Sequence, residues 1–428
     1  MTFPKLRFYI SAAVLLAIAI PFPAQPAEIP PLDLNTLIDL ALEENPEIQA
    51  LEKRAQALRH TVPQAGSLDD PMVGVQLSSL PVGDLSLDST PMSGIQFVAK
   101  QRVPYPGKLR LRKEIASHTA DASDAEYRER VNSIVARVKR AFLHYYFINQ
   151  SILVTEENKK VLQHFVEITD AKYAVGQALQ QDALKARVEL AKMVDELVKL
   201  RQLQETARAR INNLLNRPPQ APLGKPPGFE RHEVPYSLEA LQEVSLENKP
   251  ILDVFRSNVA RFATARDLAQ KDLKPDFEFG IGYRVRSNSP MDAVRGRDFW
   301  SASFMMNIPI YAKTKQREKI KEQEANTELW QAQFQSAKND VFFNIKDLMA
   351  EIDKASKQVD LFKTGIVPQA ELALESSLSA YEVGKVDFLT LLDNELKLYK
   401  YQIEYYRVLT DYEKFVSDME LAIGMRIY

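Results

Sequence analysis

Histidines and carboxylates are the side chains of this sequence that could hold a metal ion or transfer a proton. Zinc ligands on one helix are typically three to five residues apart, and no two histidines of this sequence stand that close. Aspartate and glutamate pairs are numerous, but on charged helices they carry no specific signal. We therefore interpret all five histidines as structural or surface residues: His60, His118, His144, His164 and His232.

Catalytic nucleophiles and nucleotide-binding motifs are missing as well. The sequence contains no cysteine, which excludes disulfides, thiolate metal sites and a cysteine nucleophile. No G-x-S-x-G, P-loop or H-E-x-x-H motif occurs. Basic and acidic residues are nearly balanced, 55 against 57, so the chain presents no basic field for nucleic acid. We expect no enzyme activity, no cofactor, no resident metal and no nucleic-acid partner.

Two arginines stand in a segment whose apolar and polar residues alternate strictly. In residues 277–286, aromatic and aliphatic residues occupy every odd position, and Glu, Gly or Arg every even one. This period of two is typical of a β-strand with one apolar and one polar face. The alternation predicts that Arg284 and Arg286 share the polar face and, if the strand belongs to a barrel, set the charge of its lumen.

Three further segments show the same alternation: residues 72–77, 93–103 and 299–308. Strands of about ten residues with one apolar face are typical of transmembrane β-strands, although hairpins on a soluble domain would alternate in the same way. Phe299 and Trp300 are candidates for an aromatic girdle at a membrane interface, and packing in a core is the alternative.

The sequence contains two copies of one long unit. VPYPGK at residues 103–108 recurs as IPIYAK at 308–313, an offset of 308 − 103 = 205, and LIDLALEENPEI recurs 241 − 37 = 204 residues later as LQEVSLENKPIL. Solenoid repeats are only about 20–50 residues long. We therefore predict two half-molecules, residues 28–216 and 236–428, joined by a proline-rich linker at 217–235.

Each copy predicts the same order of elements. A first helix capped by Asp33 or Ser237 is broken by a proline, two strands follow, and two long helical segments end the copy. Those segments are residues 107–173, 177–216, 313–361 and 386–423, with Gly365 and Pro368 interrupting the helical pattern after the third. At 1.5 Å per residue the first would reach roughly 100 Å.

The N-terminus predicts export from the cytoplasm. Lys5 and Arg7 precede an apolar run at residues 8–20 and a short proline-rich stretch, which is the pattern of a signal peptide. We predict that residues 1–27 form this peptide. No later segment holds about 20 consecutive apolar residues, so a mature chain located in a membrane would have to form a barrel.

Four strands are too few to close a barrel on their own. The smallest membrane barrels have about eight strands, and an open sheet in lipid would leave backbone groups without partners. Helices of this length also need neighbours to cover their apolar stripes. The chain is therefore predicted to oligomerise, and three copies would supply twelve strands.

The order and duplication of these features resemble the outer membrane efflux proteins, the TolC-like channels, over essentially the whole mature chain. The features that carry the resemblance are the Asn45-Pro46 break with its weaker copy Lys249-Pro250, the junction at residues 103–108, the Tyr-x-x-Gly turns at Tyr173 and Tyr381, and the segment INNLLN at 211–216. The junction is most similar to the branch that serves heavy-metal efflux.

This resemblance implies an α+β membrane protein, mainly α, with two tandem repeats each of helix, β-hairpin and long helical hairpin. Three copies would form a twelve-stranded β-barrel in the outer membrane, continued by an α-helical barrel across the periplasm. The homotrimer would dock to a periplasmic adaptor protein and an inner-membrane pump. It would conduct metal cations or small molecules passively, since the pump supplies the energy.

The resemblance also assigns roles to residues at the two helical turns. In the family these turns lie at the periplasmic tip, which implies that Val175, Gly176, Val383 and Gly384 contact the adaptor. A constricting acidic pair follows the second turn, and its positions fall here on Thr390 and Asp393, or on Asp182 and Lys185 in the first copy. Carboxylates from three chains would favour cations; solvated helix-surface charges are the alternative. The pore candidates are Asp393, Asp387 and Asp182.

The sequence leaves three other functions open. A soluble periplasmic coiled-coil scaffold or adaptor would share the long helices, but it would not need apolar strand faces. A type I protein secretion duct would share the whole architecture and differ only in cargo. An enzyme of unrecognised type is the third, and no motif favours it.

Overall fold

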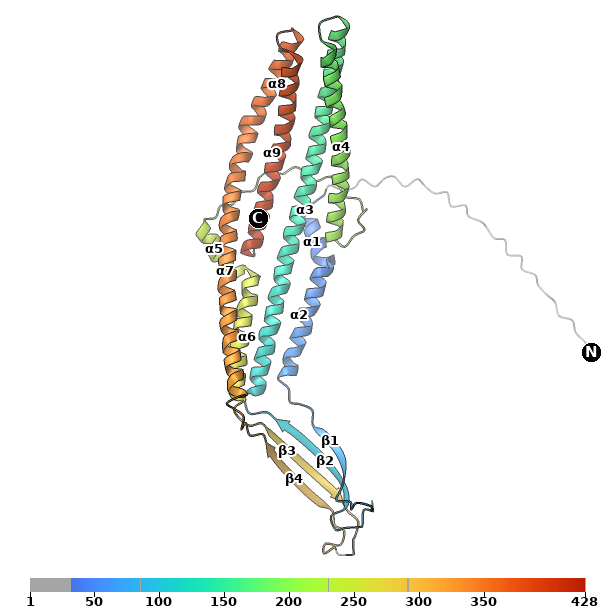
Figure 1. The fold of residues 1–428 in the computed structure, drawn as a ribbon, viewed down its shortest axis with the longest axis vertical. Coiled ribbons are helices and arrows are strands. Elements are labelled where there is room, and N and C mark those ends of the chain that lie inside the picture. Colours follow the sequence, from blue (N-terminus) through green and yellow to red (C-terminus); the bar gives the residue numbers. More distant parts are fainter. Residues whose placement is uncertain (1–31, 85, 230, 291, 428) are drawn as a thin grey trace, which may run out of the picture.

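The computed structural model describes residues 32–84, 86–229, 231–290 and 292–427. The molecule is elongated, with one β-sheet at one end and two helical hairpin tips at the opposite end (Figure 1). The signal peptide predicted at residues 1–27 lies outside the described residues.

Each half begins with a helix that proline divides into two pieces, as predicted. The pieces are α1 (Leu34–Glu44) and α2 (Pro46–Ala65) in the first half, and α5 (Leu238–Asn248) and α6 (Pro250–Lys271) in the second. The Thr36 backbone N–H donates to the Asp33 carboxylate at 2.8 Å, and the Ala240 N–H donates to the Ser237 hydroxyl at 3.2 Å. Proline starts α2 and α6 because the first helical residue needs no backbone donor.

The four strands form one antiparallel sheet in the order β1-β2-β3-β4. They are β1 (Met72–Ser78), β2 (Gly94–Val103), β3 (Phe277–Val285) and β4 (Phe299–Met306). The register places Val75, Phe97, Tyr283 and Trp300 in one row across all four strands. Directly paired residues share a face, so the predicted apolar face is confirmed. Strands β1 and β4 are the edges of this sheet within the chain.

The long helices carry the chain from the sheet to the tips. They are α3 (Lys108–Ala174), α4 (Gln180–Leu214), α7 (Gln316–Leu361), α8 (Val367–Glu382) and α9 (Phe388–Ile423). Helix α3 has 67 residues, or roughly 100 Å at 1.5 Å per residue. A π-helical turn, η1 (Phe362–Ile366), joins α7 to α8 and contains Gly365, where an interruption is predicted.

Side-by-side helix packing holds the two halves together. Near the sheet, α2 packs on α3, α3 on α6, and α6 on α7; towards the tips, α3 packs on α4 and α9, and α8 on α9. Each half has its own apolar core, built around Ile134 in the first and Ile345 in the second, and a third core near the tips contains Phe165 and Phe388. Repeat one therefore meets repeat two where α3 packs on α6 and on α9.

Candidate channel and docking surfaces

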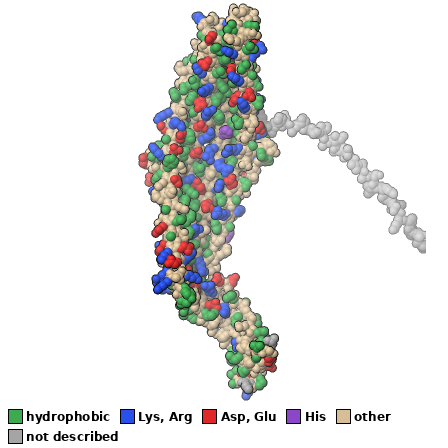
Figure 2. All heavy atoms as spheres, in the orientation of Figure 1, with side chains coloured by type: hydrophobic (Ala, Val, Ile, Leu, Met, Phe, Trp, Pro, Cys, Tyr) green, Lys and Arg blue, Asp and Glu red, His purple; other side chains and the backbone are tan. Residues whose placement is uncertain are grey.

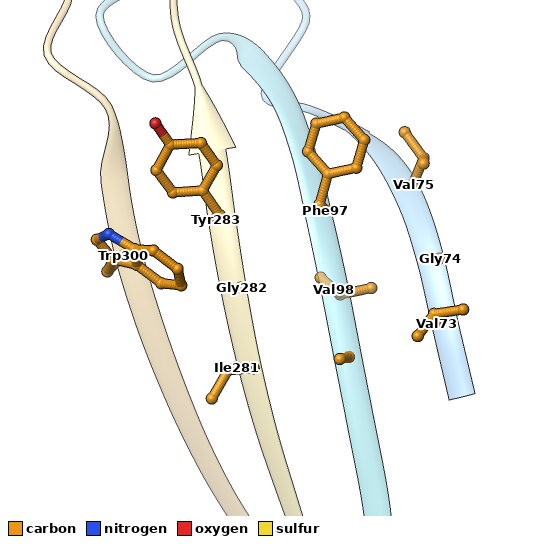
Figure 3. Close-up of a pocket in the computed structure, with 10 residues that line it drawn as sticks. Val73, Gly74, Val75, Phe97, Val98, Ile281, Gly282, Tyr283 and Trp300 are labelled. Atoms are coloured by element: carbon orange, nitrogen blue, oxygen red, sulfur yellow. The ribbon is translucent and has the colours of Figure 1, made fainter. Parts of the chain in front are cut away.

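One face of the sheet is an exposed apolar surface. Trp300 is 75 % exposed, and Phe97, Ile281 and Phe304 are each at least half exposed. Figure 3 shows neighbouring side chains of this face from all four strands. Soluble monomers rarely expose a contiguous apolar patch of more than a few hundred Å², so this face requires a lipid or protein neighbour.

The opposite face of the sheet is polar, as the alternation predicts. Arg284 lies on it and donates to the Gln96 side-chain oxygen at 2.8 Å and to the Met92 carbonyl at 3.2 Å. Lys100 and Glu278 form an ion pair across β2 and β3 at 3.4 Å. Figure 2 shows that charged side chains are sparse over the sheet in this view and frequent over the helices.

Arg286 does not follow the predicted pattern. Strand β3 ends at Val285, and the Arg286 guanidinium turns into the loops beyond the strand, where it is buried. It donates to Asp292 at 2.9 Å and to the Arg297 carbonyl at 2.8 Å, and it also bonds the Pro91 carbonyl. Asp292 offsets its charge, and Arg286 does not share the polar strand face with Arg284, although the alternation predicts that it does.

Phe299 is the second correction to the predicted sheet. Its ring lies under the Arg286 guanidinium, with the guanidinium carbon 4.0 Å from the ring centroid. Successive strand residues point to opposite faces, so Phe299 and Trp300 cannot belong to one girdle. The Arg286 bonds to Pro91 and Asp292 hold the β1–β2 and β3–β4 loops together.

The junction between sheet and helices is organised by Asp276. Its carboxylate accepts hydrogen bonds from Lys108 at 2.8 Å, the Tyr105 backbone N–H at 3.0 Å and Arg102 at 3.3 Å. Burial alone would raise the pKa of Asp276, but the Lys108, Tyr105 and Arg102 bonds outweigh it and hold the pKa below its ordinary value. Lys108 and Tyr105 belong to the VPYPGK motif, so the motif binds the second half of the chain here.

The two tip turns have nearly the same geometry. Gly176 and Gly384 adopt φ of +72° and +74°, as the prediction of left-handed turns requires. Val175 and Val383, one residue before each glycine, are both 68 % exposed. The Lys172 ammonium lies 5.2 Å from the centroid of the Tyr381 ring and donates to the Glu382 carbonyl at 2.9 Å. These contacts join one hairpin tip to the other.

The three acidic pore candidates have different surroundings. Asp387 is the N-cap of α9, and its carboxylate accepts the Thr390 backbone N–H at 2.8 Å. Asp393 is exposed and forms an ion pair with Lys397 at 2.6 Å. Asp182 lies in the first turn of α4; burial raises the pKa of Tyr381, and the charge of Asp182 adds to that rise. Asp387 thus has a local role that its position before a helix could have predicted.

Sequence reasoning missed a set of buried polar groups between α3 and α9. Glu395 is almost fully buried and accepts a hydrogen bond from the Asn158 amide at 2.5 Å. Burial raises the pKa of Glu395 to about 7. One signal was available: Glu395 continues the apolar spacing of Phe388, Leu391 and Leu398, which marks a core position. A second buried pair joins Lys139 to Glu420 at 2.5 Å.

The described residues contain neither a candidate metal site nor a candidate membrane-spanning helix. Within these residues, no group of three His, Asp or Glu side chains is arranged to hold a metal ion. In the same residues, none of the helices combines the length and apolar character needed to cross a membrane.

An apolar sheet face at one end, a helix of roughly 100 Å that leads to hairpin tips at the other, and two tandem repeats are together typical of outer-membrane channel proteins. Two solved structures share this fold. The chain matches CusC with a TM-score of 0.79 at 15 % identity, covering 95 % of this chain and 99 % of that one. It matches VceC of Vibrio cholerae with a TM-score of 0.77 at 16 % identity, covering 92 % and 97 %.

The chain belongs to the outer membrane efflux protein family, whose model matches residues 37–217 and 241–424. A characterised relative is the cobalt-zinc-cadmium resistance protein CzcC of Cupriavidus metallidurans, 22 % identical over 403 residues that cover 92 % of this chain and 90 % of that protein. The tandem-repeat barrel fold is thereby confirmed. The protein is an outer-membrane efflux channel that extends into the periplasm, and its family and fold are those of channel proteins.

Proposed function

We propose that three copies of this chain close one channel and that the channel works with a periplasmic adaptor and an inner-membrane pump. The β-sheet is the main support for a trimer. Its β1 and β4 edges have no neighbouring strand among the described residues, and its apolar face is exposed. Edges in lipid must be paired, and three four-stranded sheets reach the even number typical of bacterial barrels.

Divalent heavy-metal cations are the proposed cargo. The relative CzcC is named as a cobalt-zinc-cadmium resistance protein, and the VPYPGK junction is similar to the heavy-metal branch. The proposed pore acids are Asp393, Asp387 and Asp182, of which Asp393 and Asp387 are exposed and Asp182 is partly exposed. A ring of such groups would attract cations.

Deleting the gene is expected to lower survival on cobalt, zinc and cadmium salts and to leave survival on a panel of hydrophobic drugs unchanged. The growth inhibition on each compound, with the wild-type gene restored as control, measures this. Loss of secreted proteins without any change in metal survival would replace efflux by type I protein secretion. Drug sensitivity alone would replace the metal cargo by small organic molecules.

The tip turns are proposed as the adaptor-docking surface, formed by Val175, Gly176, Val383 and Gly384. Two equally exposed valines beside two equivalent turns support a contact that repeats around the ring. We expect Val175→Asp combined with Val383→Asp to weaken adaptor binding by about 30-fold, because a charge at the centre of an apolar contact costs roughly 2 kcal/mol.

Affinity of the purified channel for its adaptor measures this, with Val82→Asp as the control. Val82 is another exposed valine, but it lies in the β1–β2 loop at the opposite end of the molecule. Equal binding by the tip variant and the Val82 variant would contradict docking at the turns.

We also propose the boundaries indicated by the sequence. Residues 1–27 are removed on export, and the repeats comprise residues 28–216 and 236–428 with the linker at 217–235. Mass spectrometry of the protein isolated from membranes tests the first of these boundaries directly.

A further inference from the structure

The two copies of the junction motif differ in what covers them. In the first copy Pro104 is buried and Lys108 is only 2 % exposed. In the second copy Ile308 is 69 % exposed, Ile310 is similarly open, and Lys313, which corresponds to Lys108, is exposed. One copy of the same motif is therefore covered and the other is bare.

The cover of the first copy is the loop between α6 and β3. Lys108 reaches Asp276 at 2.8 Å and Asp272 at 3.0 Å, both in this loop. The Tyr105 ring packs near Phe277, with ring centroids 6.5 Å apart. The junction of repeat one is thus completed by a segment of repeat two.

The strand register identifies the counterpart of this loop in repeat one. Lys100 of β2 corresponds to Met305 of β4, since 100 + 205 = 305. Lys100 pairs with Met72 and Met305 pairs with Glu278, so Met72 corresponds to Glu278, an offset of 278 − 72 = 206. By the same offset, Asp276 corresponds to Asp70.

Asp70 lies in the exposed loop between α2 and β1, with Leu68 and Asp69 exposed beside it. This loop cannot cover the bare motif of its own chain, because β1 and β4 are opposite edges of the sheet (Figure 1). Lys313 and Asp70 have no ion-pair partner within the described part of the chain. Figure 2 shows basic side chains gathered where the helices meet the sheet, on the side of α7.

We propose that the α2–β1 loop of a second copy of this chain fills the bare junction, so that Lys313 pairs with the partner subunit's Asp70. The contact repeats between subunits what Lys108 and Asp276 do within one chain. It rests on the proposed trimer and adds to it the residues that join its subunits.

The same offsets fix the strand register between subunits. Within the chain, Val98 of β2 pairs with Gly282 of β3. The counterpart of Val98 in β4 is Ser303, since 98 + 205 = 303, and the counterpart of Gly282 in β1 is Gln76, since 282 − 206 = 76. Ser303 is therefore expected to lie opposite the partner subunit's Gln76. Phe304 then lies opposite the partner subunit's Val75, so the apolar faces of the two sheets are continuous. A shift by one residue would place apolar side chains opposite polar ones.

Disulfide crosslinking tests this register, and the cysteine-free chain provides a clean background. Oxidation of the Ser303→Cys, Gln76→Cys double variant is expected to yield covalent trimers on a non-reducing denaturing gel. The Ser301→Cys, Gln76→Cys control, two residues out of register on the same face, should yield mainly monomers. A trimer without links in the first variant, or stronger links in the control, overturns the register. A wild-type protein that is not trimeric in detergent overturns the proposed assembly itself.

Charge exchange tests the ion pair. Lys313→Asp should lower the temperature at which the trimer dissociates, and Lys313→Asp combined with Asp70→Lys should restore it. Lys319→Asp is the control, because Lys319 pairs with Glu322 of its own helix at 2.8 Å. An unchanged dissociation temperature in Lys313→Asp, or no recovery in the exchanged variant, overturns the pairing.

Discussion

Replacing Asp276 by alanine is expected to destabilise the protein by about 3–5 kcal/mol, the typical cost of removing one partner of a buried ion pair. The reason is Lys108, which is buried and depends on Asp276 and the more exposed Asp272 for its counter-charge. The Tyr105 backbone N–H would also lose its acceptor. The buried ammonium would keep only the half-exposed Asp272 as a counter-charge, and this costs more than losing one of the exposed ion pairs elsewhere on these helices.

Thermal unfolding of the detergent-solubilised protein measures this loss, with Asp353→Ala as the control. Asp353 pairs with Lys357 on an exposed helix surface, where a pair contributes about 0.5 kcal/mol or less. Combining Asp276→Ala with Lys108→Met should recover part of the stability, because the buried charge that has lost its buried partner is then removed. A loss no larger in Asp276→Ala than in Asp353→Ala would show that the junction does not depend on this carboxylate.

Replacing Glu395 by glutamine is expected to stabilise the protein by about 3 kcal/mol at pH 8 and to change little at pH 4. Burial raises the pKa of Glu395 from 4.5 to about 7. Between these values the folded protein holds a proton that the unfolded chain has released, so stability falls as the pH rises through this window. Glutamine has no charge to bury and can still accept the bond from Asn158.

Unfolding curves recorded at several pH values check this, with Asp393→Asn as the matched control. Asp393 is two residues away on the same helix, but it is exposed and paired with Lys397. Its replacement should shift stability by about 0.5 kcal/mol or less at every pH. An identical pH dependence in Glu395→Gln and the wild type would mean that Glu395 does not titrate in this window.

The sequence predicted the elements of this fold well because their signals are local. The period of two in residues 277–285 and the prolines at Pro46 and Pro250 each act within a few residues. Arg286 was misplaced because alternation says nothing about where a strand ends. The strand ends at Val285, where a loop carboxylate draws the next side chain out of the pattern.

The buried polar groups could not be predicted from local patterns. Asp276 lies 168 residues from Lys108, and Asn158 lies 237 residues from Glu395. Such pairs depend on which helix packs on which, and the spacing of residues along one helix does not encode that. The roles of the tip acids and turns remain predictions for the same reason, because their neighbours in a ring belong to other chains.

Because two repeats are joined in one chain, only some of the contacts around the channel depend on protein concentration. The α3–α6 seam and the β2–β3 pairing form within a single polypeptide, so dilution does not weaken them. Covalent linkage gives such contacts an effective concentration in the millimolar range. In the proposed trimer only the alternate seams, where α7 and β4 meet the α2 and β1 of the next copy, are bimolecular. Half of the contacts around the ring are therefore already made before any two chains meet.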